Sequence, residues 1–228
     1  MLANAPVGGA GKEGTMRRMA LLLTVMAAAL VLASGVALAV NKLGTDGPDT
    51  LRGTDGDDDL SGRGGNDTLF SLDGTDNLSG GTGKDIVVGG TERRNGLGDK
   101  NLLGSSGNDV VLGGRSNDSI SGGLGNDFVD GNPGSDNVAG EQGTDLVFEG
   151  GLQEASKDDL SGGPGNDWVA PLNDPAFGDV VTCGGGFDRV LADSKDVVAA
   201  DCEKVWFGLA SEEAFFGSIP QSFDQGLP

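Results

Sequence analysis

The chain has 228 residues, of which 43 are glycine; it lacks histidine and tyrosine, and aromatic residues make up only 5%. This composition argues against an ordinary globular core, because too few large side chains are available to fill one. Asp and Glu outnumber Lys and Arg by 35 to 15, which disfavours nucleic acid as a partner and favours cations, calcium first because it prefers oxygen ligands.

The first 39 residues have the layout of an export signal. Met16-Arg17-Arg18 is a positive segment, Ala20 to Leu32 is apolar, and Ala37-Leu38-Ala39 provides small residues for cleavage. Cleavage there leaves 12 basic and 34 acidic residues and predicts a secreted, extracellular protein. The alternative is an uncleaved membrane anchor, since Met19 to Val40 is almost continuously apolar. Residues 1–15 precede a second possible start and are assigned no function.

A nine-residue repeat follows, in which three positions keep their phase. Position four is glycine in ten of twelve repeats, which suits a tight turn because glycine tolerates positive φ. Position eight is always aliphatic: Leu51, Leu60, Leu69, Leu78, Val87, Val111, Ile120, Val129, Val138, Val147, Leu160 and Val169. Position six is always aspartate: Asp49, Asp58, Asp67, Asp76, Asp85, Asp109, Asp118, Asp127, Asp136, Asp145, Asp158 and Asp167.

This phase divides each repeat into a six-residue turn and a three-residue strand whose middle side chain points inward. Two repeats then make one coil of 18 residues, and like turns stack about one strand spacing apart, about 4.8 Å. Carboxylates stacked at that spacing repel each other unless a divalent cation lies between them. The alternative is a series of ordinary turns in which each aspartate bonds only its own backbone.

The pattern G-G-x-G-x-D-x-U-x resembles the RTX, or haemolysin-type, calcium-binding nonapeptide repeat over about residues 44 to 170. The resemblance implies an all-β fold, a parallel β-roll (residues 40–170), with several calcium ions held between turns of neighbouring coils by position-six aspartates and backbone carbonyls. It implies these aspartate ligands: Asp49, Asp58, Asp67, Asp76, Asp85, Asp109, Asp118, Asp127, Asp136, Asp145 and Asp167. The implied carbonyl donors are in the same turns, at Gly81, Gly83, Gly123, Gly125, Gly163 and Gly165.

Two interruptions break the repeat. The spacing from Asp85 to Asp109 exceeds one coil, and Lys100 occupies the position that we expect for an aspartate. We therefore expect residues 89–94 to loop out and the turn at Lys100 to lack a metal. Four extra residues intrude around Gly151 to Ala155, and for this reason Asp158 is left out of the ligand set.

Beyond the repeats, residues 171–202 read as divergent last coils. Cys183 and Cys202 are 19 residues apart, one more than a coil, so we expect them to lie nearly above one another and to form a disulfide in an oxidising compartment. Two free thiols are the alternative. Residues 203–228 contain five aromatic residues, and we interpret this segment as the cap that an open solenoid end requires, with an aromatic ligand patch as the alternative.

Catalytic signatures are absent from the sequence. The lack of histidine removes H-E-x-x-H zinc chemistry and Ser-His or Cys-His nucleophile pairs, and no G-x-S-x-G elbow occurs. We expect a non-enzymatic protein, in which calcium is the folding ligand and the role is structural. A calcium-stiffened adhesin or polysaccharide-recognition module is the alternative, with exposed positions five, seven and nine as contacts. Position seven shows no uniform row along the repeats, which favours the structural role.

Overall fold

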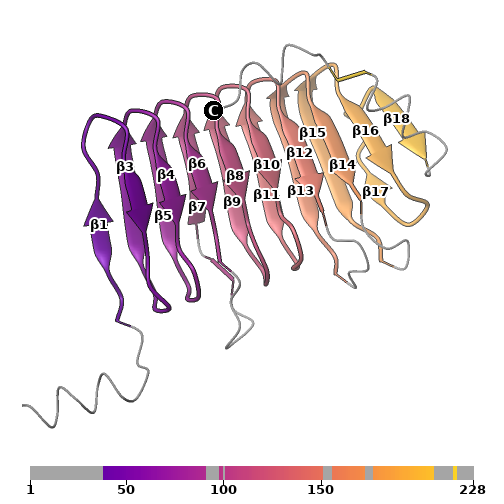
Figure 1. Cartoon of the computed structure of the whole chain (residues 1–228). Helices are drawn as coiled ribbons and strands as arrows, with labels where there is room; N and C mark the ends of the chain where they lie inside the picture. Colours follow the sequence, from indigo (N-terminus) through magenta and orange to yellow (C-terminus); the bar gives the residue numbers. More distant parts are fainter. Residues whose placement is uncertain are drawn as a thin grey trace, which may run out of the picture. The chain divides into compact units, whose positions relative to one another are not determined.

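The structure is a computed structural model that describes residues 38–90, 98–99, 101–150, 156–172, 177–207 and 218–219 (Figure 1). The expected export signal lies outside these residues except for its last two positions. The described part contains no helix long and apolar enough to cross a membrane. It is all β, with 18 strands wound into two parallel sheets that face each other, which confirms the predicted β-roll.

The two sheets alternate along the chain, so that each coil contributes one strand to each. Sheet A contains β1 (Asn41–Leu43), β3 (Asp59–Gly64), β5 (Asn77–Thr82), β7 (Asn101–Ser106), β9 (Ser119–Leu124), β11 (Asn137–Gln142), β13 (Asp159–Gly165), β15 (Val180–Gly186) and β17 (Val197–Val198). Sheet B contains β2 (Thr50–Arg52), β4 (Thr68–Phe70), β6 (Ile86–Val88), β8 (Val110–Leu112), β10 (Phe128–Asp130), β12 (Leu146–Glu149), β14 (Trp168–Pro171), β16 (Arg189–Ala192) and β18 (Lys204–Phe207).

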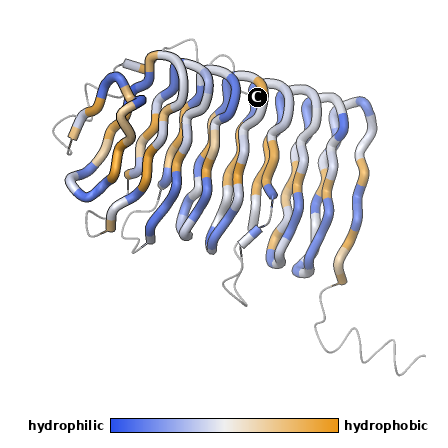
Figure 2. Tube along the Cα trace, turned by 180° about the vertical axis from the view of Figure 1, so that it is seen from behind, coloured by the Kyte–Doolittle hydropathy of each residue, from blue (hydrophilic) through white to orange (hydrophobic). Residues whose placement is uncertain are grey.

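The core is the file of position-eight side chains between the sheets. Leu60 pairs in register with Leu78, and Val87 with Val111, so that equivalent residues of successive coils stack directly. From Leu60 to Val169, the predicted position-eight residues are buried. Leu102 carries the file past the first interruption, and Val181 extends it beyond the repeats. Figure 2 shows the result: hydrophobic strand centres and hydrophilic turns. One aliphatic layer per repeat replaces a thick core.

Strands of sheet A are longer than the sequence predicts. β3, β5, β7, β9 and β11 have six residues each, whereas β4, β6, β8 and β10 have the expected three. In sheet A the pairing continues into the following turn, as between Arg63 and Gly81 or Ser105 and Gly123. Position two there adopts positive φ, 81° at Arg63 and 86° at Ser105, which bends the chain while its pairing persists.

Position-four glycines allow the coils to stack closely. At Gly107, φ is 141°, and an added Cβ would lie 1.4 Å from the carbonyl oxygen of Gly83 in the preceding coil. At Gly143 the corresponding distance, to the Gly125 oxygen, is also 1.4 Å. No side chain fits there, so glycine is required both for its φ and for the approach of the next backbone.

The predicted disulfide is present and joins adjacent coils. Cys183 and Cys202 are bonded, with their Cα atoms 5.2 Å apart. The Cys183 side chain is fully buried in the end of the core, where Val198 and Val205 also pack. The bond therefore ties β15 to the segment that leads into the last strand, β18.

A second apolar cluster lies on the outer side of sheet B. Leu146, Trp168 and Leu191 are buried there, and Trp206 and Ile219 pack against them. The Trp168 Nε1 also donates a hydrogen bond to Ser218 Oγ at 2.9 Å. The expected cap over residues 203–228 is described only in part: β18 extends sheet B, Ser218 and Ile219 contact its outer face, and Phe215, Phe216 and Phe223 lie outside the described residues.

Candidate metal sites

The position-six aspartates form two ladders, one along each row of turns. The first ladder, where the chain passes from sheet A to sheet B, is Asp49, Asp67, Asp85, Asp109, Asp127, Asp145, Asp167 and Asp188. The second, where it returns, is Asp58, Asp76, Asp99, Asp118, Asp136, Asp158, Asp179 and Asp196. Within each ladder the backbone N–H of one aspartate donates to the Oδ1 of the next, at 2.6–3.1 Å.

The second carboxylate oxygen in these turns and a backbone carbonyl of the next coil line the same space, next to the position-one glycine. A methyl group built on Gly122 would lie 2.6 Å from Asp127 Oδ2 and 2.8 Å from the carbonyl oxygen of Gly140, one coil further on. The same pairing recurs at Gly140, with Asp145 Oδ2 and the Gly162 oxygen both at 2.7 Å. Buried Oδ2 atoms lacking any hydrogen-bond partner belong to Asp67, Asp76, Asp85, Asp99, Asp109, Asp118, Asp127, Asp145, Asp167 and Asp188.

Adjacent carboxylate and carbonyl oxygens without a donor are unfavourable by themselves, because each loses its hydration and gains no partner. A cation that accepts both oxygens removes the penalty. Calcium suits this donor set, since it takes six to eight carboxylate and carbonyl oxygens in flexible geometry. The residues present therefore fit calcium.

The cost of burying the ladder carboxylates also appears in their pKa values, which are raised. Burial raises the pKa of Asp99 and Asp145 to about 8, against the backbone hydrogen bond that each accepts. Burial likewise raises the pKa of Asp109 and Asp167 to about 7, and ladder neighbours add repulsion in both cases. For Asp127, burial raises the pKa to about 6. Near neutral pH, part of the ladder carboxyls are therefore protonated when no metal is bound. A divalent cation that binds the carboxylates displaces those protons.

The first coil is different from the others. Thr45 N–H donates to Asp49 Oδ2 at 2.6 Å, and this bond lowers the pKa of Asp49. Thr54 N–H donates in the same way to Asp58 Oδ2 at 2.5 Å. These two aspartates follow the alternative reading, in which the carboxylate bonds its own turn, and they need a cation less than the interior members do.

All eleven predicted aspartate ligands lie in the two ladders, and the predicted carbonyl donors divide into two groups. The carbonyl oxygens of Gly83, Gly125, Gly163 and Gly165 face a glycine of the next coil. Gly81 and Gly123 have positive φ at position two, and each faces a carbonyl of the preceding coil, that of Arg63 and Ser105 respectively. The carbonyls beside Oδ2 are mainly those of position one, such as Gly140, which sequence reasoning did not select.

The turn expected to lack a ligand at Lys100 has one. Asp76 N–H donates to Asp99 Oδ1 at 2.9 Å, and Asp99 N–H donates to Asp118 Oδ1 at 2.6 Å, so Asp99 occupies the ladder. Counting back two positions from the core residue Leu102 gives Lys100, but here the separation is three. The extra residues follow Gly90, which still faces Gly114, and residues 91–97 lie outside the described part.

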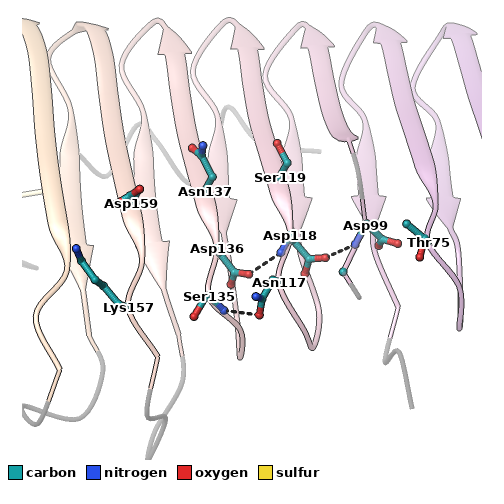
Figure 3. Close-up of a pocket in the computed structure, with 11 residues that line it drawn as sticks. Thr75, Asp99, Asn117, Asp118, Ser119, Ser135, Asp136, Asn137, Lys157 and Asp159 are labelled. Atoms are coloured by element: carbon teal, nitrogen blue, oxygen red, sulfur yellow. Dashed lines mark hydrogen bonds between the residues drawn. The ribbon is translucent and has the colours of Figure 1, made fainter. Parts of the chain in front are cut away.

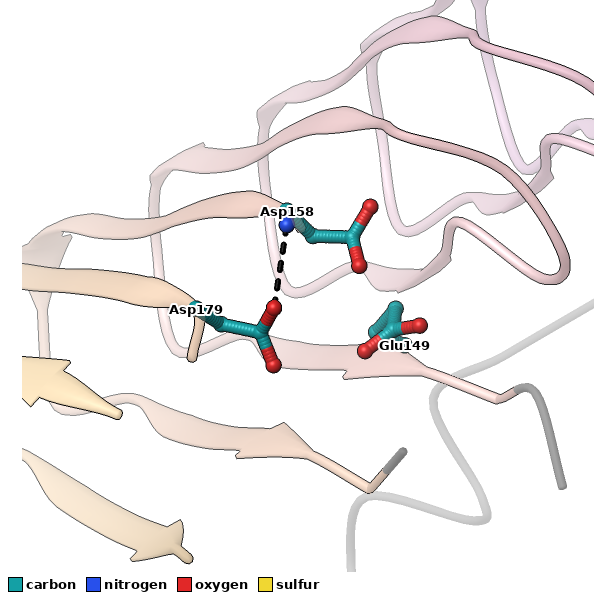
Figure 4. Close-up of side chains that lie close together, drawn as sticks. All are labelled: Glu149, Asp158 and Asp179. Carbon is teal, nitrogen blue, oxygen red and sulfur yellow. Dashed lines mark hydrogen bonds between the residues drawn. The ribbon is translucent and has the colours of Figure 1, made fainter. Parts of the chain in front are cut away.

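The ladder also continues past the second interruption, with an added carboxylate. Asp136 N–H donates to Asp158 Oδ1 at 2.6 Å, and Asp158 N–H donates to Asp179 Oδ1 at 3.0 Å. Glu149, fully buried, replaces the position-one glycine of this turn, and a carboxylate oxygen of each of Glu149, Asp158 and Asp179 lies within 4.8 Å of the others (Figure 4). Burial raises the pKa of Asp158. Asp158 thus lies in the ladder, but its Oδ2 accepts a hydrogen bond from Ser156 Oγ at 3.4 Å, so it differs from the interior aspartates whose Oδ2 has no partner.

Position five has an internal role that the sequence did not indicate. The Oδ1 of Asn108 accepts a hydrogen bond from the N–H of Asn126 at 3.0 Å, and the Oδ1 of Asn126 accepts one from Thr144 at 2.9 Å. On the other row of turns, Asn117 Oδ1 accepts from Ser135 N–H at 2.9 Å. Side chains at position five thus connect successive coils next to the aspartate ladders.

Comparison with known families agrees with this geometry. The family model described as the RTX calcium-binding nonapeptide repeat (4 copies) matches residues 43–78, 70–91, 103–138, 112–147 and 154–170. No curated protein matches the chain. The matched segments contain most of both ladders, while Asp99, Asp179, Asp188 and Asp196 lie outside them.

Proposed function

Because the chain belongs to the RTX calcium-binding nonapeptide repeat family, we propose that it is an exported protein whose β-roll folds when calcium fills the turns between its coils. Its role in this proposal is structural and extracellular, and it is not enzymatic. Calcium supplies positive charge between carboxylates that otherwise repel. The chain itself supplies the core file, the turns and the oxygen donors.

The main observation behind this proposal is the set of buried aspartate Oδ2 atoms that lie near backbone carbonyls. Ten ladder aspartates have an Oδ2 without a hydrogen-bond partner, in a chain with a net charge of −20 and one aliphatic layer per repeat. Low hydrophobicity combined with high net charge is typical of disordered chains. We therefore infer that the apolar file alone does not hold the coils together and that calcium binding contributes the missing free energy of folding.

Export is supported by two independent features. The N-terminal segment has the arrangement of a signal sequence, and the Cys183–Cys202 disulfide suits an oxidising compartment. Extracellular calcium is also abundant enough for modules that bind at about 10⁻⁴ to 10⁻³ M. The proposed location and the proposed folding ligand are therefore consistent with each other.

The test is circular dichroism of the mature chain in chelator and during calcium titration. We expect a largely unfolded spectrum in chelator and a cooperative gain of β structure at about 10⁻⁴ to 10⁻³ M calcium. Magnesium at the same ionic strength is the control, because it requires shorter and more nearly octahedral coordination than calcium does. Identical folded spectra with and without calcium would contradict the proposal.

A second candidate is a calcium-stiffened recognition module for extracellular polysaccharide. One observation favours it: when position seven is followed within sheet A alone, a row of polar side chains appears that the mixed repeat order conceals. The two candidates are compatible, since the first concerns folding and the second concerns one face of the folded roll.

A further inference from the structure

We propose that the outer face of sheet A binds a neutral, linear polysaccharide along a track that crosses the strands. This rests on the proposed function, because the track exists only in the folded roll. It specifies the partner class, the face and the residues.

The track is the position-seven row of sheet A. One side chain per strand points outward, from Asn41 through Asn77, Asn101, Ser119 and Asn137 to Asp159. The row crosses β1 to β13, which is six strand spacings or about 29 Å. Such a length suits a polymer rather than a single small molecule.

Two hollows include side chains of this row. One, of about 390 Å³, is lined by Asn41, Asp59, Asn77 and Asn101 together with position-nine residues such as Ser79. A second, of about 580 Å³, includes Ser119, Asn137 and Asp159 of the row (Figure 3). The rest of its lining is turn residues, among them Asn117, Ser135, Lys157 and the ladder members Asp99, Asp118 and Asp136. Figure 3 places the row on the sheet just above the buried ladder aspartates.

Side chains of the row are already ordered relative to one another. Asn77 Nδ2 donates to Asp59 Oδ1 at 2.8 Å, and Asn101 Nδ2 donates to Asn77 Oδ1 at 3.0 Å. Each amide nitrogen carries two hydrogens, so one remains for a ligand, and each amide oxygen has a second lone pair. A file of such groups offers donors and acceptors alternately, as hydroxyl groups of a sugar polymer require.

Other polymers fit this face poorly. Nucleic acid and anionic polysaccharide would meet the exposed carboxylates of Asp59 and Asp159, which belong to the row and lie outside the calcium ladders. A peptide cannot add as a strand here, because interior strands of sheet A are hydrogen-bonded on both sides. An apolar partner would prefer sheet B, where the same position holds Ile86, Val110 and Phe128. An uncharged, hydroxyl-bearing polymer remains.

The experiment measures retention of the full, calcium-loaded mature chain in gels containing a β-1,3-glucan, a xylan or a galactomannan, with alginate as the anionic comparison. We expect retardation by at least one neutral polymer and none by alginate. The combined variant Asn77→Ala, Asn101→Ala and Asn137→Ala should weaken binding about a hundredfold, about fivefold for each lost hydrogen bond. The matched control, Thr50→Ala with Thr68→Ala, changes the same position on sheet B and should bind normally.

Circular dichroism of the same samples separates this proposal from the one on which it rests. If calcium does not fold the wild-type chain, the proposed function fails. If the chain folds but none of the three neutral polymers retards it, if alginate binds better, or if both variants bind alike, the polysaccharide track is wrong and calcium-dependent folding still stands.

Discussion

Replacing Asp127 with asparagine should shift the stability of the roll in opposite directions with and without calcium. The substitution preserves side-chain shape and leaves Oδ1 to accept the Asp109 N–H, a bond of 2.8 Å. It changes Oδ2, which is buried and has no hydrogen-bond partner, into an NH₂ group near the carbonyl oxygen of Gly140. The variant therefore places a donor in a space that is otherwise lined by two acceptors.

The size of the effect in chelator follows from the pKa. Burial raises the pKa of Asp127 to about 6 from the ordinary 3.8, so at pH 8 its ionised form costs the metal-free fold about 3 kcal/mol. The neutral amide of the Asp127→Asn variant avoids that cost, and the metal-free variant should be more stable by up to about 3 kcal/mol. With calcium, the turns on both sides of the residue lose a charged ligand, and the midpoint for calcium should rise about tenfold or more.

The assay is circular dichroism at pH 8 in two series: a calcium titration, and chelator with increasing trimethylamine N-oxide, an osmolyte that favours compact states. The control is Asp130→Asn, because Asp130 lies outside the ladders and its Oδ1 accepts from the N–H groups of Asn132 and Gly150. An Asp127→Asn variant with an unchanged calcium midpoint, or one destabilised in chelator as well, would refute the assignment of this carboxylate to calcium.

Three other predictions concern protons, backbone and disulfide. Ladder carboxyls whose pKa in the folded state is about 6 to 8 bind protons more tightly when the chain is folded, so the metal-free fold should lose stability as pH rises through that window. The calcium midpoint should rise as pH falls through the same window, because protons then compete with calcium for the carboxylates. A calcium midpoint independent of pH would contradict this. Gly107→Ala should destabilise the calcium-loaded roll by about 3 kcal/mol or more, whereas Gly185→Ala, with nothing within 4 Å of the added methyl group, should cost less than about 0.5 kcal/mol in chemical denaturation. Reduction of Cys183–Cys202 should lower the melting temperature of the calcium-loaded protein by several degrees, since closing a loop of this size is worth about 3 kcal/mol, and an unchanged melting temperature would show that the bond adds no stability.

Much of the roll could be predicted because its core and its ladders depend on local phase. An aliphatic residue two positions after each aspartate predicted Val129 and Val147 as core, and both are fully buried. The phase fails where the chain inserts residues, because the pattern cannot say where extra residues are placed within a turn. At Asp99 the structure keeps both the core contact of Leu102 and the ladder bond to Asp118, although Asp99 and Leu102 are three positions apart instead of two.

The side chains on each outer face of the roll could not be predicted from the nine-residue repeat. A face receives one strand from each coil, so its side chains recur every eighteen residues, whereas the repeat that defines the register has nine. Read along the chain, position seven alternates between Asp59 and Thr68 or Asn77 and Ile86, and no row emerges. Read within one sheet, the same position is polar on sheet A from Asn41 to Asp159. On sheet B it is increasingly apolar from Thr50 to the buried Trp168, after which Arg189 follows. Calcium requires both rows of turns to be alike, which enforces the nine-residue period on glycine, aspartate and the core. Differences between the two sheets, which repeat every eighteen residues, are free of that requirement. The residues that differ in this way are therefore the ones that can adapt to what each face contacts.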